Sequence, residues 1–386
     1  MKVLYAMAHP SDRLADERAG HVVRPRQLLA ALERVGHEVL VEEAAGPPIA
    51  VRAASTYWRL RSALPAPAAL TARDLARVVQ NGRFSHKLSA RVLEWRPDFV
   101  LETQVAFSHA GVRAVRGLRT PVVLDDVSPV EEDEETYDVK LKGLARSRRA
   151  KSLAGAALIT ITSNTIRAAL VAEGVPADRL AVIPNGIPDT ALDRGAELET
   201  LRDRLGFARD EVILGYAGSF QPFHRFDLLI RALAEPGMPE RVRVLALGDG
   251  AARGGLESLA NELGVGPRIV FSGRVPSDDV SSYLQVTDVG VLPATEDYTN
   301  PMKLYDYMGA GLPVIAPNQV AVTDVLPQGG SLFTPGSVSA LAQAIETLVA
   351  DPRRRAAGSV AAKSAALHHT WSARARQLID EISARM

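Results

Sequence analysis

Residues 212–250 read VILGYAGSFQPFHRFDLLIRALAEPGMPERVRVLALGDG and contain one strand–helix–strand unit. Two apolar, β-branched runs, VILGYA and VRVLAL, predict strands, and the apolar stripe of FDLLIRAL predicts a helix between them. Glycine follows each predicted strand, at Gly218 and Gly248, where backbone can approach a ligand closely. Units of this kind build parallel sheets covered by helices.

The same alternation extends over the rest of the chain and restarts after the turn-rich segment PNGIPD, near Ile187. We therefore expect an α/β fold of two tandem Rossmann-like domains, with mostly parallel, doubly wound sheets that face a cleft. Strands are expected at 2–7, 37–41, 99–102, 122–124, 158–162, 180–183, 269–272, 289–293 and 314–316, and further helices at 24–35, 256–263 and 303–309.

Composition limits the chemistry. The chain has 386 residues, more than one core usually organises, and no cysteine, which excludes disulfides, thiolate metal sites and a cysteine nucleophile. His9 interrupts the first apolar run, and no later run approaches the roughly 18 residues of a membrane span. We expect a cytoplasmic enzyme that works with carboxylates, histidines, hydroxyls, cations and backbone amides.

Charge argues against a nucleic-acid partner. Residues 1–188 hold 26 Lys and Arg against 21 Asp and Glu, and the remainder holds 19 against 24, whereas a surface that binds nucleic-acid phosphates shows a larger basic excess. Residues 51–95 hold Trp58, Trp95 and eight basic residues against two acidic ones. We interpret this stretch as helices with solvated arginines; a membrane-docking or acceptor-binding face is the less favoured alternative.

Ligands of open α/β sheets bind at the carboxyl ends of the strands, so the loops after the predicted strands hold the candidate site residues. The loop GSFQPFHRFD offers His224 and Arg225 before a helix, which suits a diphosphate, although an ordinary loop with a basic residue explains it equally well. The loop GDGAARGG lacks a dinucleotide fingerprint and a P-loop lysine. SGRVPSDD is either a turn or an extended segment that holds a base through its backbone.

The most specific loop is EDYTNPMKLYDYMGAGLPVIA, residues 296–316. Asn300 is interpreted as the N-cap of a helix that begins with Pro301. The unpaired amides at this helix start and the ammonium of Lys303 would bind phosphate, and Asp306, one turn further, would accept both hydroxyls of a ribose. A purely structural helix has no need of this arrangement.

With these loops in place, the chain resembles the family 4 retaining glycosyltransferases of the GT-B fold, nearly from end to end. PNGI is similar to the family's hinge, GSFQPFHRFDLLIRAL to its phosphate loop, and NPMKLYDYMGAGLPVIA to the segment that contacts diphosphate and ribose. HHTWSARARQLIDEI resembles the terminal helix that crosses back to the first domain. The resemblance implies an acceptor-binding domain at 1–187, a donor-binding domain at 188–370 and a crossing helix at 371–386.

The resemblance also implies a reaction and its residues. We expect retaining, metal-independent transfer of a hexose from a nucleotide-sugar, UDP-hexose first, to a small-molecule or saccharide acceptor, by a monomer or homodimer without a cofactor. Arg225, Lys303 and His109 are assigned to catalysis; for His109, a helix-start histidine without a catalytic part is the close alternative. The donor-binding residues are expected to be Gly20, Gly218, Ser219, His224, Gly248, Arg274, Val275, Asn300, Pro301, Met302, Lys303, Leu304 and Asp306.

The chain departs from the family's pattern at two places. Where the family commonly carries two glutamates, this chain has Tyr298 and Asp306, although a subgroup with a proline-x-lysine segment also lacks the first glutamate. The phosphate loop, usually lysine-glycine, reads His224–Arg225 here, and arginine can bind phosphate in place of lysine. Two rival classes stay open: a nucleotide-sugar epimerase, and a pseudoenzyme that binds nucleotide-sugar without transferring it.

The acceptor is the least determined part. DDVSPVEEDEETYD, residues 125–138, is densely acidic and would attract a cationic acceptor such as an aminocyclitol or amino sugar, as in natural-product assembly; a solvated acidic helix is the favoured alternative. The basic, tryptophan-bearing stretch 51–95 suggests a lipid-linked acceptor instead. The base of the donor is expected to meet backbone near Val275, so side chains do not identify it.

Overall fold

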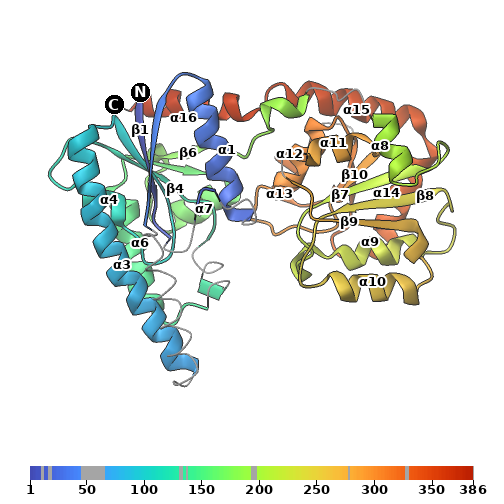
Figure 1. Cartoon of the computed structure of the whole chain (residues 1–386), viewed down its shortest axis with the longest axis horizontal. Helices are drawn as coiled ribbons and strands as arrows, with labels where there is room; N and C mark the ends of the chain where they lie inside the picture. The colour runs from blue at the N-terminus through green and yellow to red at the C-terminus, as the bar shows by residue number, and fades with distance from the viewer. Residues whose placement is uncertain are drawn as a thin grey trace. The chain divides into compact units, whose positions relative to one another are not determined.

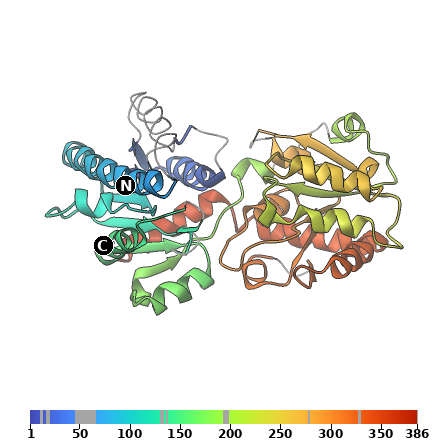
Figure 2. The same cartoon turned by 90° about the horizontal axis from the view of Figure 1, so that it is seen from below.

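The structure is a computed structural model, and it describes residues 1–9, 13–15, 20–44, 66–129, 134–135, 138–192, 198–276, 279–326 and 330–385. Contacts divide the chain into two compact units, Met1–Pro184 with Arg374–Met386, and Asn185–Ala373. Each unit contains one parallel sheet with helices on its faces, which Figures 1 and 2 show from two directions. The predicted α/β fold of two Rossmann-like domains is thereby confirmed.

The first unit has a six-stranded sheet in the order β2-β1-β3-β4-β5-β6, with every neighbouring pair parallel. Apart from the edge strand β2, its strands are almost wholly buried, as parallel strands between two helical layers are. The strands are β1 (Lys2–Met7), β2 (Glu38–Glu43), β3 (Phe99–Thr103), β4 (Val122–Asp125), β5 (Leu158–Ile161) and β6 (Leu180–Val182).

One layer of the first unit is built on a single long helix, which contributes Phe84, Leu88 and Val92 to a cluster with Leu4 and Val100 of the sheet. This helix confirms the helical interpretation of the stretch 51–95 from Ala66 onward, whereas Trp58 lies outside the described residues. The helices are α1 (Gly20–Arg34), α3 (Ala66–Trp95), α4 (Ala110–Ala114), α6 (Lys142–Gly155), α7 (Asn164–Ala172) and, from the C-terminus, α16 (Trp371–Ser383).

A buried ion pair fastens α1 to the sheet. The guanidinium of Arg24 donates to both carboxylate oxygens of Asp125, at 3.0 and 2.9 Å, and to the carbonyl of Ile183 at 2.9 Å. The hydroxyl of Thr160 donates to the same carboxylate at 2.8 Å. Because both charged side chains are buried and fully bonded, neither can lose its partner without leaving an uncompensated charge.

The second unit has a six-stranded parallel sheet in the order β12-β11-β10-β7-β8-β9, which is the strand order of a dinucleotide-binding fold. The strands are β7 (Val212–Ala217), β8 (Val242–Leu247), β9 (Ile269–Gly273), β10 (Val289–Val291), β11 (Val314–Pro317) and β12 (Ser331–Phe333). The helices are α8 (Leu198–Arg204), α9 (Phe226–Leu233), α10 (Arg253–Glu262), α11 (Val280–Gln285), α12 (Met302–Gly309), α13 (Val320–Thr323), α14 (Val338–Ala350) and α15 (Pro352–Ala366).

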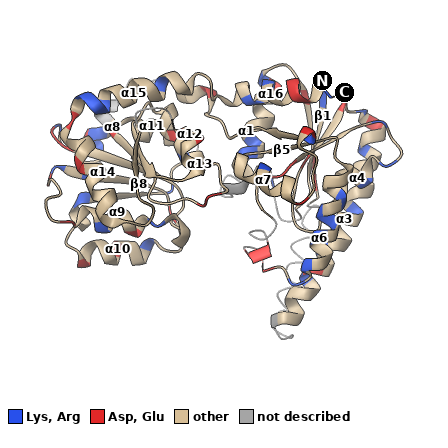
Figure 3. Cartoon of the chain, turned by 180° about the vertical axis from the view of Figure 1, so that it is seen from behind, with Lys and Arg blue, Asp and Glu red and all other residues tan. Residues whose placement is uncertain are grey.

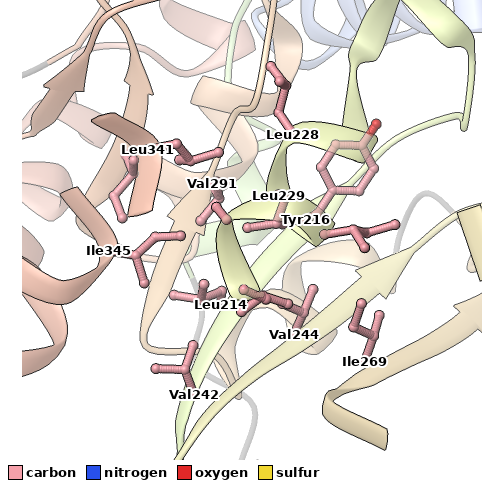
Figure 4. Packing of buried hydrophobic residues seen from close by; sticks show 14 of the residues in the cluster. Leu214, Tyr216, Leu228, Leu229, Val242, Val244, Ile269, Val291, Leu341 and Ile345 are labelled. Atoms are coloured by element: carbon pink, nitrogen blue, oxygen red, sulfur yellow. The ribbon is translucent and has the colours of Figure 1, made fainter. Parts of the chain in front are cut away.

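Alternate residues of the β7 strand face two separate cores. Leu214 and Tyr216 join a cluster with α9, α10 and α14, part of which Figure 4 shows, while Ile213 and Ala217 join a cluster with α11, α12 and α15. Figure 1 shows α9 and α10 on one side of this sheet and α12 and α15 on the other. The central strands are buried on both faces for this reason, which explains their continuous apolar runs.

The segment at Ile187 pairs with the chain before α16. The amide of Ile187 donates to the carbonyl of His369 at 2.7 Å, and the amide of Trp371 donates to the carbonyl of Ile187 at 2.9 Å. A Cβ on Gly186 would lie 2.9 Å from the Trp371 ring, so only glycine fits between them. The boundaries between the two units fall after Pro184 and after Ala373, close to these paired segments. The boundaries predicted from the sequence lie after residues 187 and 370.

The predicted strands are all present, and those of β1, β7 and β8 have the predicted bounds. The predicted helix at 24–35 begins earlier, at Gly20, with Pro25 inside its second turn. Sequence reasoning missed β12 and the helices α6, α7, α13, α14 and α15. The missed strand is a three-residue edge strand, too short to show an alternating pattern.

Replacing Arg24 with alanine should destabilise the first unit by about 3–5 kcal/mol, because Asp125 would remain buried without its cation. Urea unfolding followed by circular dichroism measures this change. Arg34→Ala, at an exposed position in the last turn of the same helix, is the control and should change the free energy of unfolding by less than about 0.5 kcal/mol. Equal unfolding midpoints for Arg24→Ala and the unmodified chain would show that the Arg24–Asp125 ion pair does not stabilise the first unit.

Candidate functional site

Glycines at the carboxyl ends of three adjacent strands let their loops pack without side chains between them. Gly218 after β7 and Gly248 after β8 have φ of +150° and +135°. A Cβ on Gly248 would lie 1.9 Å from the carbonyl oxygen of Gly218, and the Gly248 amide donates to Gly273 at 2.9 Å. A Cβ on Gly218 would lie 2.4 Å from Cε of Lys303. The glycines therefore bring a lysine of α12 against the end of β7.

The ammonium of Lys303 is held by an imidazole and an aromatic face. Its Nζ lies 3.2 Å from Nε2 of His224 and 5.7 Å from the ring centroid of Tyr216. Nδ1 of His224 lies 2.6 Å from the carbonyl oxygen of Ser219, which can only accept, so Nδ1 carries the proton and Nε2 accepts from Lys303. Burial and the Lys303 charge lower the pKa of His224 to about 4, which keeps the imidazole neutral at pH 7.

Lys303 and Asp306 lie one turn apart on α12. The charge of each side chain counteracts the effect of burial on the pKa of the other. Burial lowers the pKa of Lys303 to about 8, and the Asp306 charge counteracts part of this effect. Burial raises the pKa of Asp306 to about 6, with Lys303 counteracting. No described residue forms a hydrogen bond or an ion pair with the Asp306 carboxylate. At neutral pH a cation and an unbonded anion thus share the site.

These groups lie at the topological switch point of the sheet. β7 and β10 are neighbours, and the connections that follow them lead to opposite edges of the sheet. Open α/β sheets bind ligands at such a point, and the first amides of α12 have no carbonyl acceptor within their helix. An ammonium, free helix-start amides and a carboxylate together suit a ligand that carries both phosphate and hydroxyl groups.

Arg225 lies apart from this group. The residue has φ of +48°, in the left-handed region, and its guanidinium makes two hydrogen bonds to Asp227, at 2.9 and 3.1 Å. Its side chain is about half exposed, and no hydrogen bond joins its guanidinium to Lys303 or His224. The structure thus brings His224, rather than Arg225, next to the lysine. Arg225 stays a predicted phosphate ligand that would have to exchange Asp227 for phosphate.

The predicted N-cap role of Asn300 is wrong. Pro301 occupies the N-cap position of α12, and no side chain caps the helix. The Asn300 carboxamide oxygen instead accepts from the amide of Asn185 at 2.7 Å, and the Asn185 side chain donates to the Asn300 carbonyl at 2.6 Å. This reciprocal pair uses the oxygen that a cap would need, so Asn300 positions the loop.

The remaining predicted donor residues vary in burial. Met302 begins α12, Leu304 is buried in its core-facing side, and Val275 is partly buried against the same core. Arg274 is exposed, and no described residue pairs with it. Gly20 is the first residue of α1 in the other unit.

His109 begins α4 at the carboxyl end of β3, beside the switch point of the first sheet. Its Nδ1 lies 3.2 Å from a guanidinium nitrogen of Arg148. Burial, and then the charges of Arg148, Lys151 and Arg113, lower the pKa of His109 to about 4. Sequence reasoning missed these cations, although the basic run ARSRRAK at 145–151 was visible.

Three acids of the segment 125–138 are buried and paired with arginines. Asp125 binds Arg24, Asp126 binds Arg149 at 2.7 Å, and Glu134 binds Arg146 at 2.7 and 2.9 Å. Glu131 and Glu132 lie outside the described residues. The interpretation as a solvated acidic helix is therefore wrong for Asp125, Asp126 and Glu134, whereas Glu135 is exposed.

Fold and geometry together define a two-domain α/β protein whose second unit places Lys303, Asp306 and the start of α12 at the switch point of its sheet. Two family models match the chain: "Glycosyltransferase Family 4" over residues 19–191 and "Glycosyl transferases group 1" over residues 211–351. Together they span most of both units. The chain belongs to the family 4 glycosyltransferases, as the sequence resemblance indicated, and is an enzyme of that class.

Curated relatives are similar over part of their length. The D-inositol 3-phosphate glycosyltransferase of Stackebrandtia nassauensis is 28% identical over 235 residues, which cover 58% of this chain and 53% of that protein. The 2-deoxystreptamine glucosyltransferase of Streptomyces kanamyceticus is 28% identical over 202 residues, covering 51% and 52%. The chain thus spans about half the length of the curated relatives it matches.

Solved structures confirm the GT-B fold. Anabaena Alr3699/HepE in complex with UDP-glucose aligns with a TM-score of 0.71 at 19% identity, over 100% of both chains. Sucrose-phosphate synthase from Thermosynechococcus elongatus aligns with a TM-score of 0.73 at 19% identity, again over 100% of both chains. Within the described residues, no helix is long and apolar enough to span a bilayer, and no three His, Asp or Glu side chains gather as a metal would require.

Gly248→Ala should destabilise the second unit by at least about 2 kcal/mol, because a methyl group at φ +135° would collide with the Gly218 carbonyl. Gly254→Ala on α10 is the matched control. No atom lies within 4 Å of its Cβ position, so alanine should stabilise the helix by roughly 0.5–1 kcal/mol. The urea unfolding midpoints of the two variants should move in opposite directions. A shift of both midpoints in the same direction would contradict the close contact between Gly248 and the Gly218 carbonyl.

Lys303→Met should raise the pKa of His224 from about 4, since it removes a positive charge that disfavours the imidazolium. Histidine ring shifts, followed by NMR over pH 3–8, report this pKa. Arg204→Met, an exposed cation on α8, should leave the titration unchanged. A His224 midpoint that is equal in Lys303→Met and the unmodified chain would show that the two side chains are not neighbours.

Proposed function

We propose that this glycosyltransferase moves a hexose from a nucleotide-sugar, with UDP-hexose the first candidate, to a hydroxyl of a small-molecule or saccharide acceptor. The observation that carries the proposal is the cation at the start of α12, where Lys303 lies against Gly218 and no side chain caps the helix. The relative solved with UDP-glucose supports the choice of donor, although its 19% identity shows the fold alone.

The proposed division of labour follows from charge. Lys303 and the first amides of α12 would hold the diphosphate, and the unbonded carboxylate of Asp306 would accept hydroxyls of the ribose. His224 is neutral and fixes the ammonium through its Nε2 lone pair. Gly218 and Gly248 leave room for the ligand to meet backbone.

The proposed reaction retains the configuration of the anomeric carbon. The bond from that carbon to the leaving phosphate oxygen breaks with its electron pair, and the acceptor oxygen forms the new bond on the same face. The acceptor proton passes to the departing diphosphate. Negative charge grows on the diphosphate as this bond breaks, so Lys303 and the helix-start amides stabilise the transition state more than the ground state. This step needs no metal ion, and we propose that none takes part.

The acceptor is proposed to be a polyol or sugar hydroxyl. The relatives' names include a glycosyltransferase of D-inositol 3-phosphate and a glucosyltransferase of 2-deoxystreptamine, two small cyclitols. His109 is proposed to face the reacting sugar, because its neutral ring carries a proton on Nε2 that can be donated. A pseudoenzyme is the second candidate, since Tyr298 replaces the family's first glutamate.

Thermal-shift titration with UDP, GDP and dTDP tests the donor, because a ligand that binds the folded state raises its melting temperature in proportion to affinity. We expect UDP to give the largest shift. Incubation of isotope-labelled UDP-glucose with cyclitol acceptors should then yield a labelled glycoside. UDP binding without product would establish the pseudoenzyme, and no shift with any nucleotide would refute the donor site.

Lys303→Met should lower the transfer rate about a hundredfold, which corresponds to roughly 3 kcal/mol of lost transition-state stabilisation. The loss should appear mainly in kcat, because the charge on the diphosphate grows as the glycosidic bond breaks. Arg204→Met on α8 removes an equal charge at an exposed position and should retain full activity. Unchanged kcat in Lys303→Met would exclude the lysine from catalysis.

A further inference from the structure

Three cations in the first unit act on the imidazole of His109, and Arg148 lies in direct contact with it, 3.2 Å from Nδ1. Arg113 of α4 and Lys151 of α6 are exposed, and Arg148 of α6 is half-buried. All three bear electrostatically on His109. Within the part of the chain that the structure describes, no carboxylate pairs with any of the three. We call Arg113, Arg148 and Lys151 the cationic cluster.

The other basic residues of α6 contrast with the cationic cluster. Arg146 and Lys142 both bind the buried carboxylate of Glu134, at 2.7 and 3.4 Å. Arg149 binds Asp126 at 2.7 Å and Glu173 at 2.6 Å. Figure 3 shows how much of α6 is basic. The described acids nearby are thus used by one set of cations, and the cationic cluster has none.

Arg148 is the half-buried member of the cationic cluster, and one of its donors has no partner among the described residues. One terminal nitrogen lies 3.2 Å from Nδ1 of His109, which therefore accepts, while Nε is buried and has no hydrogen-bond partner among the described residues. Burial, and then the like charge of Arg113, lower the pKa of Arg148. An anion would relieve the repulsion between these like charges, and it would also satisfy the unbonded donors of the guanidinium.

Glu102 is the carboxylate closest in sequence to His109, and it does not neutralise the cationic cluster. It is fully buried and accepts from the hydroxyl of Ser108 at 2.5 Å and from the amide of Gly111 at 2.7 Å. Burial raises its pKa, so its charge is disfavoured. Its bonds fix the loop that carries His109 and leave the three cations unpaired.

We infer that the cationic cluster binds a phosphate monoester group on the acceptor. A phosphate monoester carries about −1.5 to −2 charges at pH 7, which suits three cations better than a single carboxylate does. A planar guanidinium and an ammonium are the side chains that bind phosphate oxygens. The Nε2 proton of His109 adds a neutral donor beside them. An amine-bearing acceptor would instead be repelled by the same side chains.

The role as acceptor site rests on the proposed function, whereas anion binding does not, so binding is tested first without any donor. The probes are inorganic phosphate and glycerol 1-phosphate in isothermal titration. Arg148→Gln should weaken binding roughly 10- to 100-fold, as the loss of charge-assisted hydrogen bonds implies. Arg116→Gln, an exposed cation just after α4, is the matched control and should bind as the unmodified chain does.

Two further variants make this test decisive. Lys303→Met removes the phosphate-binding lysine of the second unit, so affinity that survives in Lys303→Met but falls in Arg148→Gln belongs to the cationic cluster. Lys151→Gln changes an exposed side chain that no core depends on, and it should also weaken binding if Arg148→Gln fails to fold. Equal phosphate affinity in Lys151→Gln and the unmodified chain would overturn the inference.

Transfer then tests the acceptor class. With UDP-glucose as donor, a cyclitol monophosphate should be used with at least about tenfold higher kcat/KM than the same cyclitol without phosphate or with an amino group. Lys151→Gln should remove this preference while leaving KM for UDP-glucose unchanged. Phosphate binding without any transfer would refute the proposed function but not the inference. Transfer that is equally fast to the neutral or amino-bearing cyclitol would refute the inference but not the proposed function.

Discussion

The close contact between the loops after β7 and β8 is the constraint on which the second unit's site depends. Gly218 and Gly248 have backbone conformations that side chains disfavour, and their peptide groups touch where a Cβ would stand. That contact leaves space for Lys303 at the end of β7, and His224 and Tyr216 then surround its ammonium. Backbone packing therefore determines where the ammonium of Lys303 can lie, and His224 and Tyr216 then hold it there.

Sequence periodicity predicted most of the fold because the strands are buried on both faces and the helices carry one apolar stripe. β7 and β8 have the predicted bounds, since nothing competes with their continuous apolar runs. Asn300 shows the limit of such reasoning. A cap is a local pattern, whereas the bond from Asn185 to Asn300 joins residues 115 positions apart, and no window of sequence contains both.

The site was predicted to a similar degree. Its loops and Lys303 follow from strand ends and helix starts, but the choice between His224 and Arg225 depends on backbone direction. The left-handed turn at Arg225 and the carboxylate of Asp227 hold the guanidinium away from the lysine. Likewise, the acidic run at 125–138 favoured a solvated helix, with a cation-attracting surface as the alternative, whereas Asp126 and Glu134 bind arginines of α6. Ion pairs between side chains of different helices and strands determine which charged side chains remain unpaired.

The reciprocal bonds between Asn185 and Asn300 join the point where the chain enters the second unit to the loop that precedes α12. Both residues are buried, so these bonds do not compete with water. Any displacement of the helix start must therefore move the main chain at residue 185 or break two hydrogen bonds. The interdomain connection and the helix that bears the ammonium are mechanically coupled, and strain applied at either one is transmitted to the other.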